Sequence, residues 1–383
     1  MIRIASYNVE NLYARPKVFD SSDWTIGEPI LLAYQQVNTL FAKNQYNAND
    51  KQTMLSLLER LEIYTRNDVH ALRRKYAVSP RWAWLRKNRG SFDREPQDRN
   101  LDVSIIANSR NDWIGWVELA KGPTNEISTR MTSQVIRDVN ADIIGIVEAE
   151  DRPSLVKFNS ELLGGMYDHV MLIDGNDERG IDVGIMTKSN FPIESIQSNV
   201  DRMDNAGIIF SRDCPQYTVR TPNGTIVHVL INHFKSQSGG TGDAKRRRQA
   251  GAVRAIADNL INQGQHVVVM GDLNEGPQVV GQHAPNLTAL YNNNSRLVEC
   301  FSLAAFQIGN RPGTFDSCGI RNRFDYIFIS QSLVQNFIGG TVFRNGLWGS
   351  RVTRPTDWPT YPQITNSSEQ ASDHGAIYID LNI

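Results

Sequence analysis

The 383-residue sequence has few cysteines, no long apolar run and almost no net charge. Its three cysteines (Cys214, Cys300 and Cys318) are too few, and odd in number, for a disulfide framework. No stretch approaches the roughly 20 apolar residues that a membrane helix needs, and the N-terminus lacks the pattern of a signal peptide. The formal net charge of -1 excludes a uniformly basic surface, so any surface that binds nucleic acid would have to be a local basic patch. We therefore expect a folded cytoplasmic protein without membrane contact.

Internal repeats and low-complexity tracts are absent too, and short apolar runs rich in β-branched residues recur along the chain. Such runs, bounded by Gly, Pro, Asn or Asp, are typical of strands. Helical patterns begin near Ser128 and extend from Asp243 to Asn262. Strands outnumber helices and do not alternate strictly with them, which favours two packed β layers flanked by helices over a doubly wound parallel sheet. The predicted strands are 2–8, 142–149, 169–173, 182–188, 226–234, 266–271, 324–330 and 376–381.

Residues 14–127 differ in composition from the rest of the chain. The segment 52–64 has a helical pattern, and the stretch 66–89 that follows is basic and aromatic. We interpret 14–127 as a helical, basic and aromatic insertion after the first strand of a single domain that spans 1–383. The basic and aromatic residues are Arg66, Arg73, Arg74, Lys75, Tyr76, Arg81, Trp82, Trp84, Arg86, Lys87 and Arg89.

The sequence VVVMGDLNEGP (267–277) ends an apolar run in a turn that carries Asp272 and Asn274. Side chains separated by one residue lie on the same side of an extended backbone. A pair of oxygen ligands aimed one way suits a hard cation or a phosphate. Alternatively, Asp272 bonds its own backbone in a turn, as is common at strand ends.

Other predicted strand ends also carry polar residues that a core does not require. Each has an ordinary explanation by itself: His233 could be a strand residue, and Asp373 a turn residue or cap. Their shared position at strand ends instead indicates a site, because binding groups gather there and in the adjoining loops. The residues are Asn8, Glu10, Glu148, Asn232, His233, Asp272, Asn274, Asp325, Asp373 and His374.

The motifs SYNVEN, IVEAE, GIDVGIMTK, INHFKS, GDLNEGP, RFDYIFIS and ASDHGA occur in an order that resembles the endonuclease/exonuclease/phosphatase (DNase I-like) superfamily. Their spelling is most similar to the bacterial nuclease branch. The resemblance implies an α/β (α+β) fold, a four-layered α/β sandwich of two mixed β-sheets flanked by helices. It also implies a divalent-metal phosphodiesterase or phosphomonoesterase site, with Mg²⁺ expected and Mn²⁺ as the alternative.

The resemblance assigns metal-binding roles to four residues. Glu148 matches the glutamate that binds the metal, with Asn8 beside it. Glu10 could provide a second contact, and Asp373 would lie near the ion. A divalent cation held by carboxylates offsets phosphate charge and can lower the pKa of bound water, so these residue types suit the reaction.

The same resemblance assigns catalytic roles to five further residues. Asp272 matches the residue that orients or deprotonates the attacking water, and Asn274 the one that contacts the phosphate. His374 matches the histidine at the scissile phosphate, and Asp325 the carboxylate that orients its imidazole. His233 matches a second catalytic histidine of the nuclease branches. A His–Asp pair fixes the tautomer and favours the imidazolium, which stabilises developing charge on phosphoryl oxygens.

We predict a nuclease that hydrolyses DNA, with RNA as an alternative, by metal-assisted in-line attack of water. The basic and aromatic stretch 66–89, through Arg73, Arg74, Arg86 and Lys87, could neutralise phosphates and stack on bases. Lys235 and the run 246–248 follow the histidine strand and could add to this surface.

Three other interpretations remain open at this level. The protein could act on a small-molecule or lipid phosphodiester or phosphate, with the insertion as a lid. It could be a catalytically silent binding module on the same fold, since a fold by itself does not choose the substrate. The arginine-rich stretch could be a solvated helix face, with Trp82 and Trp84 in the core. Nothing in the sequence identifies a protein partner or inhibitor.

Overall fold

The computed structural model describes residues 1–10, 12–20, 24–77, 80–123, 125–177, 180–237, 242–292 and 294–383. The chain forms two compact units: Met1–Tyr13 with Thr124–Ile383, here called the sandwich unit, and Ala14–Pro123, here called the insert unit. Two parts of the predicted motifs lie outside the described residues. They are Asn11 in SYNVEN and residues 238–241 of the glycine-rich loop after INHFKS.

The sandwich unit contains two mixed β-sheets. Both sheets are mixed because β1 with β10, β17 with β18 and β20 with β22 run parallel, whereas the other neighbours are antiparallel. The seven-stranded sheet has the order β11 (His169–Ile173), β12 (Asp182–Thr187), β10 (Ile143–Ala149), β1 (Ile2–Asn8), β23 (Ala376–Leu381), β22 (Phe337–Phe343) and β20 (Phe306–Gln307). The six-stranded sheet has the order β13 (Ile193–Gln197), β16 (Gln216–Arg220), β17 (Ile226–His233), β18 (His266–Asp272), β21 (Asp325–Ser330) and β19 (Leu297–Glu299).

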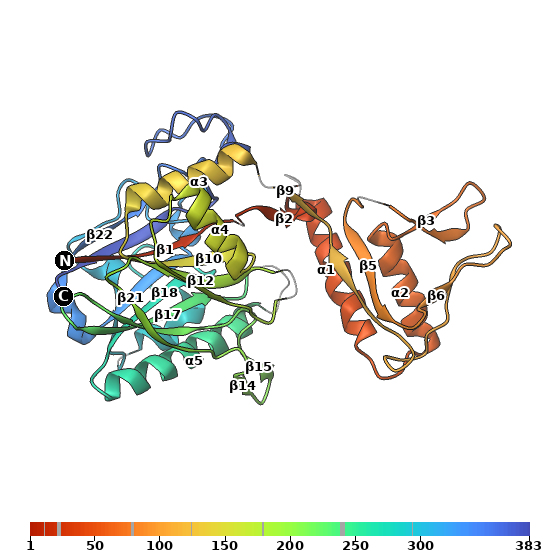
Figure 1. The fold of residues 1–383 in the computed structure, drawn as a ribbon, viewed down its shortest axis with the longest axis horizontal. Helices are drawn as coiled ribbons and strands as arrows, with labels where there is room; N and C mark the ends of the chain where they lie inside the picture. Colours follow the sequence, from red (N-terminus) through yellow and green to blue (C-terminus); the bar gives the residue numbers. More distant parts are fainter. Residues whose placement is uncertain are drawn as a thin grey trace. The chain divides into compact units, whose positions relative to one another are not determined.

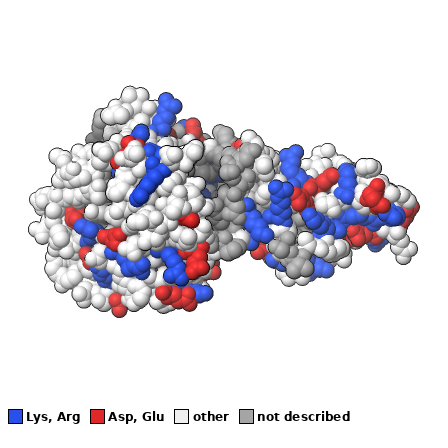
Figure 2. Space-filling view, turned by 90° about the horizontal axis from the view of Figure 1, so that it is seen from above, with Lys and Arg blue, Asp and Glu red and all other residues white. Residues whose placement is uncertain are grey.

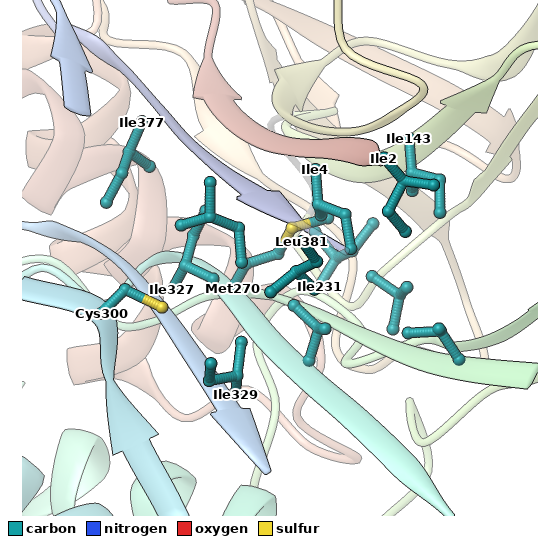
Figure 3. Close-up of a cluster of buried hydrophobic side chains, with 14 of the residues drawn as sticks. Ile2, Ile4, Ile143, Ile231, Met270, Cys300, Ile327, Ile329, Ile377 and Leu381 are labelled. Atoms are coloured by element: carbon teal, nitrogen blue, oxygen red, sulfur yellow. The ribbon is translucent and has the colours of Figure 1, made fainter. Parts of the chain in front are cut away.

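The two sheets pack face to face over a core of branched side chains. Ile4 of β1, Ile231 of β17 and Met270 of β18 belong to one buried cluster that draws on both sheets (Figure 3). Alternate residues of each strand enter this core, and the intervening ones face the helices on the outside. The strands therefore read as nearly continuous apolar runs in the sequence, because both of their faces are covered.

Helices cover the outer face of each sheet (Figure 1). Helices α3 (Glu126–Val139) and α4 (Arg152–Leu162) pack on the seven-stranded sheet, where Ile136 and Phe158 share a buried cluster with Tyr7. Helices α5 (Gly242–Asn262) and α6 (Thr288–Tyr291) pack on the six-stranded sheet, where Val253 joins Phe328. These four layers confirm the predicted α/β sandwich of two mixed sheets flanked by helices.

Each of the eight predicted strands is present, with its ends within one residue of the prediction. The helix predicted to begin near Ser128 is present as α3, which starts at Glu126 and has Asn125 rather than Ser128 as its N-cap. The Asn125 side chain accepts a hydrogen bond from the Ile127 nitrogen, whereas the Ser128 hydroxyl donates to the Gln370 carbonyl. The predicted α5 residues are correct. Among the described residues of the sandwich unit, the strands not predicted are β13, β16, β19, β20, β22 and the short pair β14 (Met203–Asp204) and β15 (Gly207–Ile208).

The insert unit has its own hydrophobic core and contains two helices and four two-stranded sheets. Rings of Phe41, Phe92 and Trp113 pack against one another at the centre, with centroids 4.5 to 5.1 Å apart. The helices are α1 (Trp24–Phe41) and α2 (Ala48–Arg60). The paired strands are β2 (Ala14–Pro16) with β9 (Lys121–Pro123), β3 (Tyr64–Arg66) with β4 (Leu72–Arg74), β5 (Ala83–Arg89) with β8 (Ile114–Leu119), and β6 (Asp93–Arg94) with β7 (Ser104–Ile105).

The basic stretch 66–89 is not a helix, which differs from the prediction of a helical insertion. Its described residues form the end of β3, then β4 and β5. In β5, Leu85 packs against the core while Trp84 and Arg86 point to the opposite face, as the two-residue period of a strand requires. The predicted helix 52–64 lies four residues earlier, over 48–60, because Asn47 and Asp50 form a capping box that begins α2.

The three cysteines Cys214, Cys300 and Cys318 are buried and unpaired. Burial raises the pKa of the thiol in each of them, so they are suited to packing rather than to reaction. In the part of the chain that the structure describes, no helix is long and apolar enough to cross a membrane.

Candidate active site

Polar side chains of both sheets meet at one edge of the sandwich unit. Strands β17 and β18 run parallel with His233 beside Asp272, and antiparallel β21 begins with Asp325 beside Asp272. In the other sheet the parallel strands β1 and β10 end at Asn8 and just after Glu148. Parallel strands end at a common edge, and an antiparallel neighbour begins there. The topology thus brings together residues that are far apart in the sequence.

His374, two residues before β23, forms a buried pair with Asp325. Its Nδ1 lies 2.7 Å from Asp325 Oδ2, and its backbone nitrogen donates to Ser372 Oγ at 3.0 Å. Ser372 donates in turn to the Asn8 carbonyl oxygen at 2.7 Å, which fixes the turn that carries His374. Burial by itself lowers the pKa of His374, but the carboxylates of Asp325 and Asp272 outweigh this effect and raise the pKa well above its ordinary value. The two carboxylates therefore favour the protonated form of the His374 imidazole.

Asp272 uses its two carboxylate oxygens differently. Oδ1 accepts a hydrogen bond from the Asn274 backbone nitrogen at 2.7 Å, which is the turn bond common at strand ends. Oδ2 lies 3.2 Å from Asn8 Nδ2, 3.7 Å from His233 Nε2 and 3.8 Å from His374 Nε2. Burial raises the pKa of Asp272, and His374 opposes this rise. Asp272 therefore satisfies both interpretations of its sequence motif: Oδ1 makes the turn bond, and Oδ2 points into the site.

Glu148 and His233 lie beside Asp272 and complete a set of donors for a metal ion. His233 Nε2 is 3.6 Å from Glu148 Oε1, and one ligand atom from each of the three residues lies within 4.8 Å of the other two. Among the described residues this is the only such group of three His, Cys, Asp or Glu side chains. Two carboxylates and an imidazole suit a divalent cation such as Mg²⁺ or Mn²⁺, so the donor chemistry fits the metal that the sequence predicts.

The other predicted metal-binding residues lie at the same edge. The Asn8 amide oxygen accepts a hydrogen bond from the Glu10 nitrogen at 3.1 Å, and Glu10 Oε2 accepts one from the Asp373 nitrogen at 3.0 Å. Asp373 Oδ1 is 3.8 Å from His374 Nε2. Asn8, Glu10 and Asp373 thus form a hydrogen-bonded chain around His374, and the Asn8 side chain links this chain to Asp272.

Several residues at this edge have positive φ angles, which residues other than glycine seldom adopt. Glu148 has φ +68° at a shift in the β10–β12 register, Asn274 has φ +53° and Glu10 has φ +49°. Gly271 has φ +132°, and a Cβ there would lie 1.9 Å from the Asn232 carbonyl oxygen. Positive φ costs a non-glycine residue roughly 1–3 kcal/mol and is concentrated at functional sites. Three such residues at one edge support its assignment as the active site.

Asn274 corrects one prediction from the sequence. We predicted that Asp272 and Asn274 project on the same side of an extended backbone, but the strand ends at Asp272 and the positive φ of Asn274 turns the chain. The Asn274 amide nitrogen donates to the Phe234 carbonyl oxygen at 3.2 Å, so it ties the ends of β17 and β18 together. Its second N–H remains available for a ligand.

Arg246, in the first turn of α5, belongs to a buried network that we did not predict. Its Nε donates to Glu275 Oε2 at 2.7 Å, and Nη1 donates to the Lys235 carbonyl oxygen at 2.9 Å. Glu275 also accepts hydrogen bonds from Asn286. Arg246 therefore holds the loop after Asp272 against the end of β17. The buried position of Arg246 could have been predicted from helical spacing, because Arg246 lies four residues before Ala250 on the apolar face of α5.

The run 246–248 is therefore not a free phosphate-binding surface, which corrects our expectation. Arg247 donates to Asn286 Oδ1, and Arg248 forms an ion pair with Asp204 at 2.5 Å. Lys235 is half-buried, and its backbone nitrogen donates to Gln249 Oε1 at 2.9 Å.

The remaining predicted contact residues lie in the insert unit. Arg73 donates to the carbonyl oxygens of Pro96 and Asp98 at 2.8 and 2.6 Å, and Arg74 pairs with Asp93 at 3.4 Å. Arg73 and Arg74 thus brace loops of their own unit. Arg86 pairs with Glu118 at 2.7 Å on the surface, and its guanidinium lies 4.8 Å from the centre of the Trp84 ring. Lys87 is exposed.

Comparison with known proteins identifies the family of the chain. Residues 89–382 match the Endonuclease/Exonuclease/phosphatase family, and the chain belongs to this family. Its superfamily consists of phosphoesterase hydrolases that typically depend on a divalent metal. The matched residues include Glu148, His233, Asp272, Asp325 and His374, whereas Asn8 and Glu10 precede them.

Several solved structures are similar to this chain at low sequence identity. An endonuclease/exonuclease/phosphatase from Bacteroides vulgatus is 16% identical, with a TM-score of 0.48 over 67% of this chain and 91% of that one. The mannosyl-6-phosphatase Bt3783 of Bacteroides thetaiotaomicron is 14% identical, with a TM-score of 0.47 over 67% and 92%. The human Nocturnin catalytic domain is 15% identical, with a TM-score of 0.48 over 67% and 86%. No curated protein matches the chain.

Proposed function

We propose that this protein is a metal-dependent phosphodiesterase that hydrolyses nucleic acid, with DNA as the expected substrate. The observation that carries the proposal is the convergence of the His374–Asp325 pair with Asp272, His233 and Glu148 at one sheet edge. A buried cation, carboxylates that could hold a metal and side-chain amides are the groups that hydrolysis of a phosphate ester requires.

The metal would be held by Glu148 and His233, two of the three residues whose donor atoms lie close together, which leaves Asp272 for the attacking water. When bound, a divalent cation would neutralise phosphate charge and make water a stronger nucleophile. The imidazole in this set is compatible with Mn²⁺ as well as Mg²⁺.

His374 would stabilise the negative charge that develops on the phosphoryl oxygens. Its Nδ1 is held by Asp325 at 2.7 Å, so the protonated ring presents Nε2 to the site in a fixed orientation. The Asn8 side-chain amide lies 3.2 Å from Asp272 Oδ2, and the Asn274 backbone nitrogen donates to Asp272 Oδ1 at 2.7 Å. Because these groups are oriented before substrate binds, little reorganisation is needed as charge develops.

Asp272 would orient the attacking water and accept its proton. Its Oδ1 is committed to the Asn274 turn bond, which holds the carboxylate in place, and Oδ2 faces the site between the two histidines. A base must lie within hydrogen-bonding reach of the proton that it takes, and Oδ2 of Asp272 lies 3.7 Å from His233 Nε2 and 3.8 Å from His374 Nε2, where the phosphate would bind.

Charge distribution supports nucleic acid as the substrate. Residues 14–123 contain 17 Lys and Arg against 13 Asp and Glu, a net charge of +4, whereas the remaining residues carry -5. Figure 2 shows Lys and Arg side chains over the surface of the insert unit, with acidic side chains among them. A basic region in an otherwise acidic chain is the electrostatic pattern expected for a polyanion-binding surface.

Cleavage assays test the proposal directly. Plasmid, single-stranded DNA, RNA, sphingomyelin and a chromogenic phosphodiester are incubated with Mg²⁺ or Mn²⁺, and with EDTA. We expect EDTA-sensitive cleavage of DNA, and we expect Glu148→Gln to require far more metal while it keeps the wild-type thermal stability. Hydrolysis of only the lipid or the small diester would favour the alternative phosphodiesterase function, and wild-type cleavage by Glu148→Gln at sub-millimolar Mg²⁺ would refute the metal assignment.

A further inference from the structure

The insert unit contains a cleft along β5 that the active site does not use. The cleft has a volume of about 270 Å³ and is lined by Arg74, Lys75, Tyr76, Trp84 and Leu85 among others. This volume is below the range of roughly 300–1,000 Å³ that is usual for complete small-molecule ligands. The cleft therefore suits one group of a larger ligand rather than a whole cofactor or substrate.

Two aromatic rings line the cleft, and solvent reaches both of them. Tyr76 is 77% exposed, and Trp84 is half-buried with one face beside Arg86. By contrast, Trp82 is buried in the core of the unit. An exposed aromatic ring that lines a concave surface offers a flat apolar face to a ligand, and planar rings are the groups that stack on it.

Cations accompany both rings. The Arg74 guanidinium lies 5.3 Å from the centre of the Tyr76 ring, and that of Arg86 lies 4.8 Å from the centre of the Trp84 ring. Over residues 66–89 the sequence has eight Lys and Arg and a single acidic residue, Asp68. The ligand that fits carries planar rings on a negatively charged chain, which is the chemistry of a nucleic acid whose bases are unpaired.

We infer that the insert unit binds single-stranded nucleic acid and that one base stacks in the cleft between Tyr76 and Trp84, here called the Tyr76–Trp84 cleft. The neighbouring phosphates would contact Arg86 and Lys87, which are exposed on the same strand. A duplex would bind less well, because its bases face one another and cannot enter the cleft. The inference rests on the proposed function for its substrate class, and it assigns the insert unit the role of selecting unpaired strands.

Binding measured in EDTA tests the inference without cleavage. Fluorescence anisotropy of labelled oligothymidylate is recorded with the full-length protein and its Tyr76→Ala and Trp84→Ala variants. We expect each variant to bind roughly tenfold more weakly, as is usual for loss of one stacking contact. Trp116→Ala is the matched control: Trp116 is 44% exposed on β8, opposite Arg86, but it does not line the cleft. We expect this control to bind like the wild type.

Three results would overturn the inference. They are wild-type affinity in both cleft variants, an equal loss in Trp116→Ala, and a wild-type preference for a duplex of the same length. Because Trp84 is half-buried, Trp84→Phe separates stacking from folding: it should retain most of the affinity and the full thermal stability. The two proposals can fail separately. If the protein binds single strands through the cleft but cleaves no nucleic acid, only the proposed nuclease function is refuted. If it cleaves DNA but the cleft variants bind like the wild type, only the role of the cleft is refuted.

Discussion

The two units of this chain place their charged groups in opposite ways. In the sandwich unit, ionisable side chains such as Asp272, Asp325, His374, Arg246 and Glu275 are buried. Among the described side chains of the insert unit, Asp50 is the only polar one that is buried, and the many cations lie at the surface. Burying a charge is costly unless it is paired, so a region keeps buried charges only where their fixed orientation is useful.

This difference indicates how each unit could act on a polyanion. Buried, paired groups in the sandwich unit are oriented before substrate arrives, which suits catalysis. Exposed cations in the insert unit attract phosphates over a distance and lose their counterions on binding, which suits capture. Substitutions should therefore act on turnover in one unit and on affinity in the other.

The largest effect is expected for the His374–Asp325 pair. His374→Ala should lower turnover by roughly 10²–10⁴ on DNA and on a small chromogenic diester alike, because the lost group acts on the phosphate itself. Asp325→Asn should impair the same step, so the double variant should lose much less than the product of the two single losses. Steady-state kinetics and thermal unfolding check this prediction. Independent, additive losses would contradict the pairing.

The buried pair of Arg246 with Glu275 should have the largest effect on stability. Arg246→Met leaves Glu275 buried without its cation, and loss of one partner of a buried pair costs about 3–5 kcal/mol. Arg86→Ala in the insert unit is the matched control, since the exposed pair with Glu118 is worth at most about 1 kcal/mol. Urea unfolding measures both. Similar losses of unfolding free energy in Arg246→Met and Arg86→Ala would contradict the difference between a buried pair in one unit and an exposed pair in the other.

Salt dependence should separate the insert unit from the catalytic site. Replacing Arg86 and Lys87 together by Gln should weaken DNA binding and reduce the log–log salt slope by about 1.4 for single strands, at about 0.7 per phosphate contact. Turnover of a small diester should stay unchanged. If the insert unit is instead a lid, small-substrate turnover should fall because closure is lost. An unchanged slope would make the basic stretch only a solvated surface. Arg73 and Arg74 are left intact because they brace loops.

An effect confined to the pH dependence of stability is expected at Asp182. Burial raises the pKa of this carboxyl to about 7, although it accepts a hydrogen bond from the Gly175 nitrogen at 2.7 Å. The folded state therefore binds a proton that the unfolded state releases near pH 4, and this contribution to stability is lost as the pH rises to about 7.

Asp182→Asn keeps an acceptor for Gly175 and should flatten this decline. Denaturant unfolding between pH 4 and 8 would show it as a smaller loss of the unfolding free energy. Asp204→Asn is the control, because Arg248 lowers the pKa of Asp204 to below the range of this titration, so its replacement should leave the decline between pH 4 and 8 unchanged. A decline as steep as that of the wild type in Asp182→Asn would contradict the assignment.

Local patterns were sufficient for much of the fold. Most of the strands that were predicted, such as β1, β10 and β17, are buried on both faces, and continuous burial leaves a clear signal in the sequence. Edge strands such as β13 and β20 were missed because their exposed faces dilute that signal. The stretch 66–89 was misinterpreted for a related reason: Arg and Lys occur on helix surfaces and on strands alike, so their number does not specify a period.

What the sequence by itself determined was the identity and order of the polar residues at strand ends, because strand periodicity and turn chemistry are local properties. Only the tertiary structure decided which of these groups meet. The Asp272 turn bond to Asn274 is local, but its second oxygen reaches Asn8, His233 and His374 only because parallel and antiparallel strands share one edge. Likewise, Arg246 is one of three adjacent arginines in the sequence, and only packing of α5 against the sheet made it the buried partner of Glu275. Residues that are alike in the local sequence can differ in burial and in partners once the chain is folded, because contacts between distant segments decide both.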